Sequence, residues 1–121
     1  MERIIICGTR TFDNYQLLCQ TLDQIITNPS DAEIISGRAK GADTLGERYA
    51  KEHNIPLVMF PAQWNLYGKS AGIRRNAEML KYAKQKNPVV IAFWDGISHG
   101  TKNMIDISRK TKATVHVIQY D

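Results

Sequence analysis

Cysteine is scarce in this 121-residue chain, and nothing in the sequence suggests a disulfide framework or a metal site. Cys7 and Cys19 both lie in apolar runs, so we expect them to be small core residues. The histidines at 53, 99 and 116 have no ligand spacing with each other or with cysteine. We therefore expect no metal and no bound cofactor.

Long hydrophobic runs are absent as well. No stretch approaches the roughly 20 apolar residues that cross a bilayer, and the apolar run near the N-terminus is too short for a signal peptide. These absences predict a cytoplasmic protein with no membrane partner.

Charge of one sign is only slightly in excess. Sixteen Lys and Arg against twelve Asp and Glu give a net charge of +4, which is too little to indicate a protein that coats nucleic acid. The length and the composition, 43% hydrophobic and 23% charged, predict one globular domain over residues 1–121.

Five short β-rich runs are separated by segments with helical periodicity. The runs are Arg3–Cys7, Ala32–Ser36, Pro56–Phe60, Pro88–Trp94 and Thr114–Gln119. Several are continuous apolar runs, which is typical of strands covered on both faces. The alternation predicts an α/β fold: one Rossmann-like, doubly wound, parallel five-stranded sheet with helices on both faces.

Four apolar stripes mark the predicted helices. The stripes are Tyr15, Leu18, Leu22, Ile25 and Ile26; Ala42, Leu45, Tyr49 and Ala50; Ile73, Ala77, Leu80 and Ala83; and Met104, Ile105 and Ser108. Asn76 falls on the third stripe, where a buried amide needs a partner from a neighbouring loop or a ligand.

The loops that follow strands are longer than those that precede them, and they contain most of the glycine. In a parallel sheet these loops meet at one edge, where such folds bind ligands and where helix N-termini attract phosphate. Basic residues collect in the same loops, at positions 10, 38, 40, 69, 74, 75 and 102, although cations are unfavourable at helix N-termini. A bound anion would remove that penalty; the alternative is that they are solvated loop charges.

The two standard glycine fingerprints are absent. Neither Gly-x-Gly-x-x-Gly nor Gly-x-x-x-x-Gly-Lys-Ser/Thr occurs, which argues against a dinucleotide dehydrogenase or a P-loop NTPase. The predicted ligand-binding residues come from the strand-end loops and the third helix: Gly8, Thr9, Arg10, Ser36, Gly37, Gly41, Ala42, Asp43, Arg75, Asn76, Asp95, Gly96, Gly100 and Thr101.

Several of these residues have two interpretations. Asp43 would either cap its helix or accept a hydrogen bond from a ribose hydroxyl. Thr101 would either contribute to a phosphate cradle or serve as an ordinary N-cap or first-turn residue. Trp64 and Tyr67 would either stack on a base or hold the long loop from Pro61 to Asn76 in place.

Four motifs resemble the YspA-like branch of the SLOG superfamily, in the same order and over nearly the whole chain. They are Gly8-Thr-Arg-Thr-Phe, Ser36-Gly-Arg-Ala-Lys-Gly-Ala-Asp, Gly68-Lys-Ser-Ala-Gly-Ile-Arg-Arg-Asn-Ala-Glu-Met-Leu and Ala92-Phe-Trp-Asp-Gly-Ile-Ser-His-Gly-Thr. The superfamily includes the Lonely Guy phosphoribohydrolases and the DNA-uptake protein DprA. The resemblance implies a Rossmann-like fold that binds nucleotides or nucleotide-derived ligands.

The hydrolase relatives place a carboxylate where this chain has Asn103 or Met104, and neither side chain can transfer a proton. Asp95 or Asp43, together with Arg75, would have to act instead. No paired carboxylates are evident, so the sequence favours a nucleotide sensor or binding domain over a nucleotide-cleaving enzyme. Single-stranded DNA binding is disfavoured, because the basic residues cluster at one edge and aromatic residues there are few. By analogy with relatives, a homodimer is compatible with the fold.

Overall fold

Five parallel strands form one sheet in the computed structural model, which describes residues 1–120. The strands are β1 (Glu2–Gly8), β2 (Ala32–Ser36), β3 (Leu57–Met59), β4 (Asn87–Trp94) and β5 (Thr114–Gln119), in the order β3-β2-β1-β4-β5. All five lie where the sequence predicts them. β3 is shorter than predicted, although the backbones of Pro56 and Phe60 still hydrogen-bond to β2.

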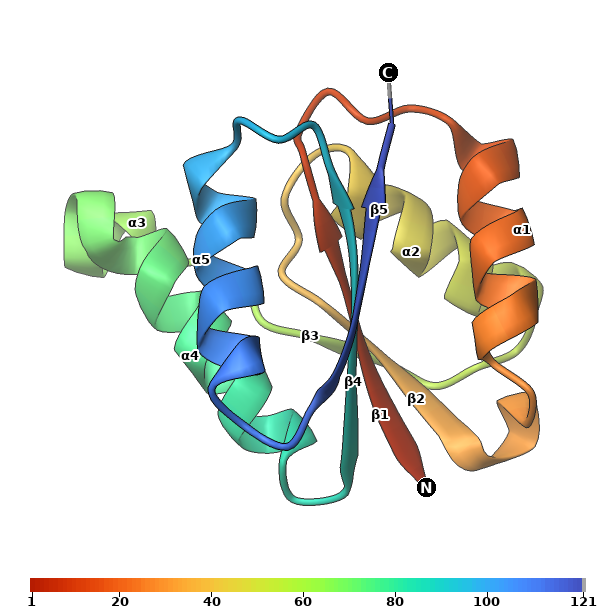
Figure 1. Ribbon diagram of the computed structural model, residues 1–121. Coiled ribbons are helices and arrows are strands. Elements are labelled where there is room, and N and C mark those ends of the chain that lie inside the picture. Colours follow the sequence, from red (N-terminus) through yellow and green to blue (C-terminus); the bar gives the residue numbers. More distant parts are fainter. Residues whose placement is uncertain (121) are drawn as a thin grey trace.

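Helices cover both faces of this sheet (Figure 1). The helices are α1 (Tyr15–Ile25), α2 (Ala42–Glu52), α3 (Trp64–Tyr67), α4 (Ala71–Ala83) and α5 (His99–Arg109). The pair α1 and α2 packs on one face, and the pair α4 and α5 packs on the other. The predicted doubly wound α/β architecture is therefore confirmed.

The central strand β1 is buried on both sides. Ile4 and Ile6 pack in the core beneath α1 and α2, whereas Ile5 and Cys7 pack in the core beneath α4 and α5. This two-residue alternation is the normal consequence of the strand pleat. It places the buried Cys7 thiol under α4 and α5, at the carboxyl end of the strand.

The third predicted apolar stripe is wrong in part. Ile73 and Ala77 are exposed, and the buried face of α4 is formed by Asn76, Met79 and Leu80 together with Ala71 and Ala83. Both phases have helical spacing, and the prediction followed the large apolar side chain of Ile73. The long loop before it is also partly helical, since α3 and a short 3₁₀ turn (Gly68–Ser70) lie within it and Arg75 belongs to α4.

The carboxyl ends of β1 and β4 are held together directly. The Thr9 amide donates to the Phe93 carbonyl at 2.9 Å, and the Thr9 hydroxyl accepts from the Asp95 amide at 3.1 Å. A Cβ atom at Gly8 would lie 2.3 Å from the same Phe93 oxygen, so only glycine permits this approach. The chain leaves β1 and β4 toward opposite faces of the sheet, which makes this the switch point where ligands bind in such folds.

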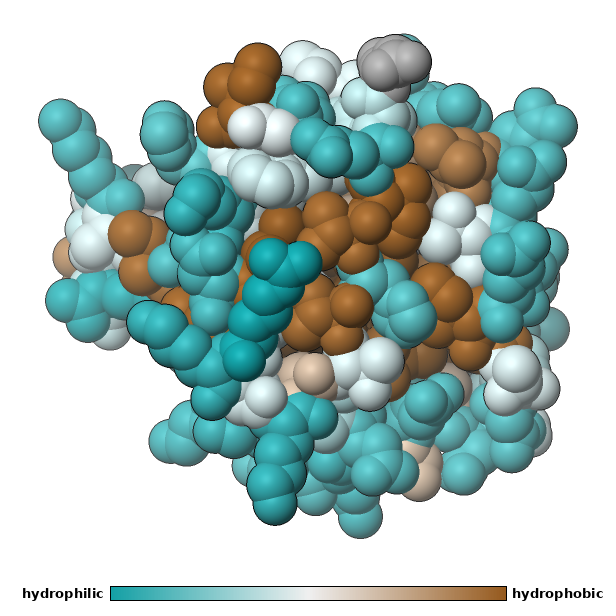
Figure 2. All heavy atoms as spheres, viewed as in Figure 1, coloured by the Kyte–Doolittle hydropathy of each residue, from teal (hydrophilic) through white to brown (hydrophobic). Residues whose placement is uncertain are grey.

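Strand β5 forms one edge of the sheet. Figure 2 shows an apolar band along this edge, between the polar surfaces of the flanking helices. Its valines and Ile118 are partly buried against the two cores. Within residues 1–120, no helix combines the length and the apolar character that a bilayer span requires.

Candidate functional site

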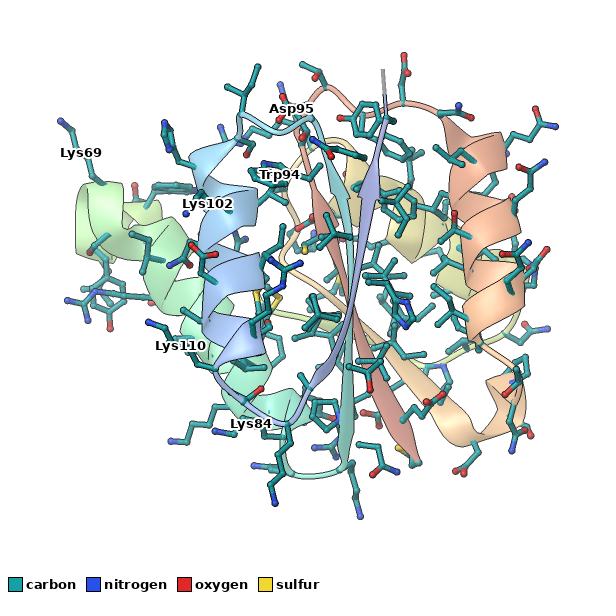
Figure 3. The ribbon with its side chains drawn as sticks, viewed as in Figure 1. Lys69, Lys84, Trp94, Asp95, Lys102 and Lys110 are labelled. Atoms are coloured by element: carbon teal, nitrogen blue, oxygen red, sulfur yellow. The ribbon has the colours of Figure 1, made fainter. Side chains whose placement is uncertain are left out.

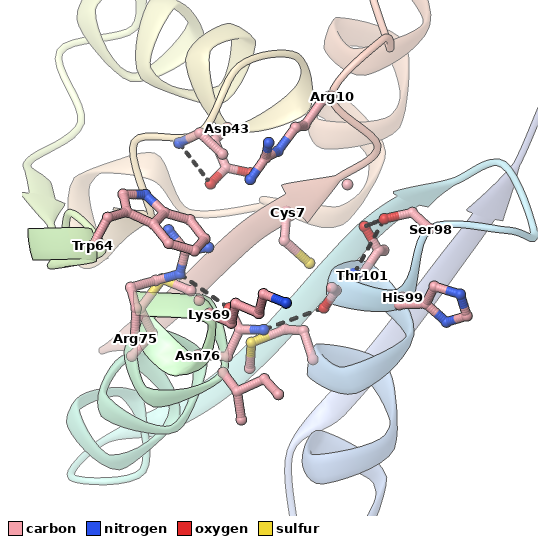
Figure 4. Close-up of a pocket in the computed structure, with 17 residues that line it drawn as sticks. Cys7, Arg10, Asp43, Trp64, Lys69, Arg75, Asn76, Ser98, His99 and Thr101 are labelled. Carbon is pink, nitrogen blue, oxygen red and sulfur yellow. Dashed lines mark hydrogen bonds between the residues drawn. The ribbon is translucent and has the colours of Figure 1, made fainter. Parts of the chain in front are cut away.

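A hollow of about 330 Å³ lies at the carboxyl end of β1, between the N-terminal parts of α4 and α5 (Figure 4). Arg75 and Asn76 on α4 face Ser98 and Thr101 at the start of α5, and Cys7 lies between them. The volume is at the lower end of the range for small-molecule sites. Seven of the predicted ligand-binding residues line it: Gly8, Arg10, Asp43, Arg75, Asn76, Gly100 and Thr101.

A second hollow, of about 520 Å³, lies beside the first and shares part of its wall. The loop between β2 and α2 forms one side, through Gly37, Arg38 and Lys40. Four residues line both hollows: Arg10, Ala39, Trp64 and Arg75. The predicted loop residue Gly37 thus belongs to this second hollow.

The N-terminus of α5 is shaped by hydrogen bonds from its own loop. Asp95 Oδ1 accepts from the amides of Ile97 and Ser98 at 2.8 and 2.9 Å. The same amides lower the pKa of Asp95, because they stabilise the charged carboxylate. Ser98 is the N-cap and accepts from the Thr101 amide, while Trp94 Nε1 donates to the Ser98 carbonyl at 3.0 Å. The carboxylate of Asp95 therefore closes a turn, and Thr101 is a buried first-turn residue.

Arg75 and Asn76 connect three segments of the chain. Arg75 donates through Nη1 to the Gly37 carbonyl and through Nε to Asn76 Oδ1 at 3.1 Å. Asn76 Nδ2 donates to the Gly100 carbonyl at 3.2 Å and to Asn103 Oδ1 at 3.0 Å. The buried amide has thus found its partners in a neighbouring element, and it fixes α4 against the first turn of α5.

Asp43 is the acidic residue of the first hollow. Its side chain is 4% exposed, and Oδ2 accepts from the Ala39 amide at 3.3 Å. Burial raises the pKa of Asp43 to about 6, against the opposing effects of the Arg75 charge and of backbone amides. Gly41, rather than Asp43, occupies the N-cap position of α2.

A second carboxylate lies one helical turn behind Asp43. Glu47 is 7% exposed, accepts from the Ser36 hydroxyl at 2.7 Å and lies 3.6 Å from Arg38 Nη1. Its negative charge contributes to the raised pKa of Asp43. This buried pair was not predicted from the sequence, although its four-residue spacing puts both side chains on the inward face of α2.

Positive charge dominates the lining of both hollows. Among residues 1–120, Arg10, Lys40, Lys69 and Arg75 have no carboxylate within 4.0 Å. Asp43 is the one acidic side chain among the described residues that line the two hollows. Lys102, by contrast, pairs with Asp106 at 2.8 Å on the outer face of α5.

The remaining predicted residues lie beside the hollows and support them. Thr9, Asp95 and Gly96 form the junction of β1 with the loop after β4, whereas Ser36, Gly41 and Ala42 form the turn into α2. Figure 3 shows Asp95 at the carboxyl end of β4, and Lys84 and Lys110 at the opposite end of the molecule. Those two lysines cap the ends of α4 and α5, which accounts for them without a ligand.

Some lining residues were not among the predicted ones. Ser98, His99 and Met104 come from α5 and its N-cap, Met79 comes from α4, and Cys7 comes from β1. A serine two residues before the Gly100-Thr101 pair was a recognisable N-cap signal. No sequence signal showed that Cys7 would line the hollow, because its position there depends on the packing of α4 and α5. In the described part of the chain, no three His, Cys, Asp or Glu side chains are grouped closely enough to hold a metal ion.

One protein family and one phage protein are similar to this chain. The family described as YspA, cpYpsA-related SLOG matches residues 2–67, which include β1, β2, β3 and the two loops that follow the first two strands. The Gene 61 protein of Mycobacterium phage D29 is 29% identical over 126 residues, covering 99% of this chain and 97% of that protein. No solved structure matches.

Proposed function

Because the chain belongs to the YspA, cpYpsA-related SLOG family, we propose that it binds a nucleotide or a nucleotide-derived ligand through a phosphate. The protein would act as a sensor or a binding domain. The ligand would lie in the hollow at the switch point, with its phosphate near the N-terminus of α5 and the side chains of Lys69 and Arg75.

The observation that carries this proposal is the charge around the hollow. In the described residues 1–120, Arg10, Lys69 and Arg75 line it with no carboxylate within 4.0 Å, and Asp43 is the one acidic side chain in its lining. Gathering three cations around one carboxyl group costs free energy unless an anion binds among them. The N-terminus of α5 adds the partial positive charge of its helix at the same place.

A second candidate function is cleavage of the bound nucleotide at its N-glycosidic bond. It is favoured by the position of Asp43, which lines the hollow with a raised pKa and so resembles a general acid. In this reaction the protonated carboxyl would donate its proton to the leaving base, while water adds to the sugar carbon and returns a proton to Asp43. Asp95 lies outside the lining and is engaged by two amides.

Binding can be tested by calorimetry with nucleoside 5′-monophosphates of all four bases. We expect at least one to bind, and Arg75→Ala to weaken that binding by about 10- to 100-fold, as for loss of a hydrogen bond to a charged group. Lys84→Ala is the matched control, because Lys84 is exposed at the far end of α4. Equal affinity of wild type and Arg75→Ala for every nucleotide would contradict the proposal.

The same mixtures, incubated and separated by chromatography, test the second function. Release of free base by the wild type, lost in Asp43→Asn while nucleotide binding persists, would show that the protein is a hydrolase. Recovery of intact nucleotide after prolonged incubation would leave binding alone.

A further inference from the structure

The two hollows adjoin each other, and cations line both. Lys69 lines only the hollow next to α5, whereas Arg38 and Lys40 line only the hollow next to the β2–α2 loop. Arg10 and Arg75 line both and so lie on the shared wall. Arg38 pairs with Glu47, but a single phosphate at the N-terminus of α5 would leave Lys40, which has no carboxylate within 4.0 Å among residues 1–120, without an anion.

The loop that carries the second set of cations has an unusual backbone. Arg38 has a φ angle of +63°, in the left-handed region that residues with side chains rarely adopt. Its conformation is held by the Ser36 hydroxyl, which accepts from the Arg38 amide at 3.0 Å, and by the ion pair with buried Glu47. Lys40 has no carboxylate within 4.0 Å among residues 1–120, so its charge is available to a ligand.

Trp64 provides a flat apolar surface on the shared wall. Its side chain is 49% exposed, and the Arg10 guanidinium lies 6.0 Å from the ring centroid. The indole also lies close to Gly72 at the start of α4, where a Cβ atom would be 3.5 Å from the ring. An exposed tryptophan beside cations is a favourable surface for stacking a nucleobase.

We infer that the ligand carries two separate phosphates, one in each hollow, with a nucleoside between them whose base stacks on Trp64. The chemical class is a nucleoside 3′,5′-bisphosphate, either as a free molecule or as one unit of a dinucleotide. This inference rests on the proposed function and specifies the ligand of the same site. Arg10 and Arg75 would neutralise charge from both phosphates, because both line the shared wall.

Three probes distinguish the two-phosphate ligand from simpler ones: a nucleoside 5′-monophosphate, the 5′-diphosphate and the 3′,5′-bisphosphate, each with all four bases. We expect the bisphosphate to bind at least about tenfold more tightly than the monophosphate, as for one added charge-assisted contact. The diphosphate, whose phosphates are contiguous, should gain less. A 5′-phosphorylated dinucleotide that matches the bisphosphate would identify the source as a dinucleotide, and weaker binding would identify the free nucleotide.

Variants assign each phosphate to its hollow. Lys40→Ala should weaken bisphosphate binding by about fivefold, as for an exposed ion pair, and leave monophosphate binding unchanged. Lys69→Ala should weaken both, and Lys84→Ala should weaken neither. Trp64→Leu should weaken the binding of both ligands. Trp64→Phe should bind both with nearly the wild-type affinity, because a phenyl ring can still stack.

The outcomes separate this inference from the proposed function. If no nucleotide binds, the proposed function is wrong. If monophosphates bind but the bisphosphate binds no better, or if Lys40→Ala affects both ligands equally, the site holds one phosphate and the inference is overturned. Thermal unfolding of each variant without ligand identifies any loss of binding that is due to misfolding.

Discussion

The side-chain amide of Asn76 on α4 donates to the backbone carbonyl of Gly100 in the first turn of α5, at 3.2 Å. This hydrogen bond joins the two helices that form the walls of the first hollow. Asn76 is 5% exposed, and its carbonyl oxygen also accepts from Arg75. A single buried side chain thus fixes the position of Arg75, which is proposed to bind the phosphate, relative to the start of α5.

Asn76→Ala should lower the free energy of unfolding by about 2 kcal/mol, because it removes two partly buried hydrogen bonds from the Asn76 amide to α5, one to the Gly100 carbonyl and one to Asn103. Urea denaturation of both proteins measures this difference. Because Arg75 loses the acceptor for its Nε, nucleotide affinity should fall as well. Unchanged stability would show that water replaces the amide, and unchanged affinity would show that Arg75 does not depend on it.

Asn76 also shows how far periodicity predicts this site. Helical spacing placed it on the buried face of its helix, and the need for a partner followed from elementary hydrogen bonding. The same stripe placed Ile73 in the core, yet its side chain is 56% exposed at the rim of the hollow. Spacing alone admits two phases of the helix, and the choice between them depends on how α4 meets α5, which a sequence does not contain.

Asp43→Asn should change the pH dependence of stability. The pKa of Asp43 is raised in the folded protein from 3.8 to about 6, so ionisation disfavours the folded state. The wild type is therefore relatively most stable below pH 4, and it should lose up to about 3 kcal/mol relative to Asp43→Asn as the pH rises through 6. Chemical denaturation of both proteins at pH 4, 5, 6 and 7 measures this difference; a constant difference would mean that Asp43 titrates normally.

Binding should follow the same titration. An anion in the hollow favours protonated Asp43, so raising the pH from 5 to 7 should weaken anion binding to the wild type relative to Asp43→Asn. Comparing the two proteins with one ligand removes the ionisation of the ligand itself. Calorimetry at the two pH values gives the ratio of affinities. A ratio that does not change would place the anion away from Asp43.

Asp95→Asn and Asp95→Ala separate a structural role from a catalytic one. The asparagine variant keeps an oxygen that can accept from the Ile97 and Ser98 amides, so it should keep its fold and its nucleotide affinity. The alanine variant cannot accept these bonds and should unfold at a lower denaturant concentration. The stability of both should be compared above pH 4, because the lowered pKa means that the stabilising charge is lost only as the pH falls through the folded-state value. If the wild type releases free base and the folded Asp95→Asn variant does not, Asp95 is a catalytic residue.

The two aspartates illustrate why residue roles were harder to predict than the fold. Strand and helix positions follow from alternation and spacing along the chain, and all five strands were predicted. Asp95 and Asp43 looked equivalent, since each follows a strand at the same edge. Their difference depends on which amides their carboxylates meet and on the burial of Glu47 behind Asp43, which only the packing of α2 on the sheet determines.

Gly41→Ala should destabilise the protein at the turn into α2, whereas Gly100→Ala should not destabilise the start of α5. Gly41 has a φ angle of +83°, and a Cβ atom there would lie 2.3 Å from the Thr9 carbonyl oxygen. The strained conformation and the contact together should lower the free energy of unfolding by about 3 kcal/mol. At Gly100 a Cβ atom would meet nothing within 4 Å, and alanine should stabilise the helix by up to about 1 kcal/mol. Denaturant unfolding of both variants tests this contrast. Equal stabilities would mean that the loop after β2 relaxes freely, and the fixed placement of Arg38 and Lys40 on which the two-phosphate ligand depends would then lose its support.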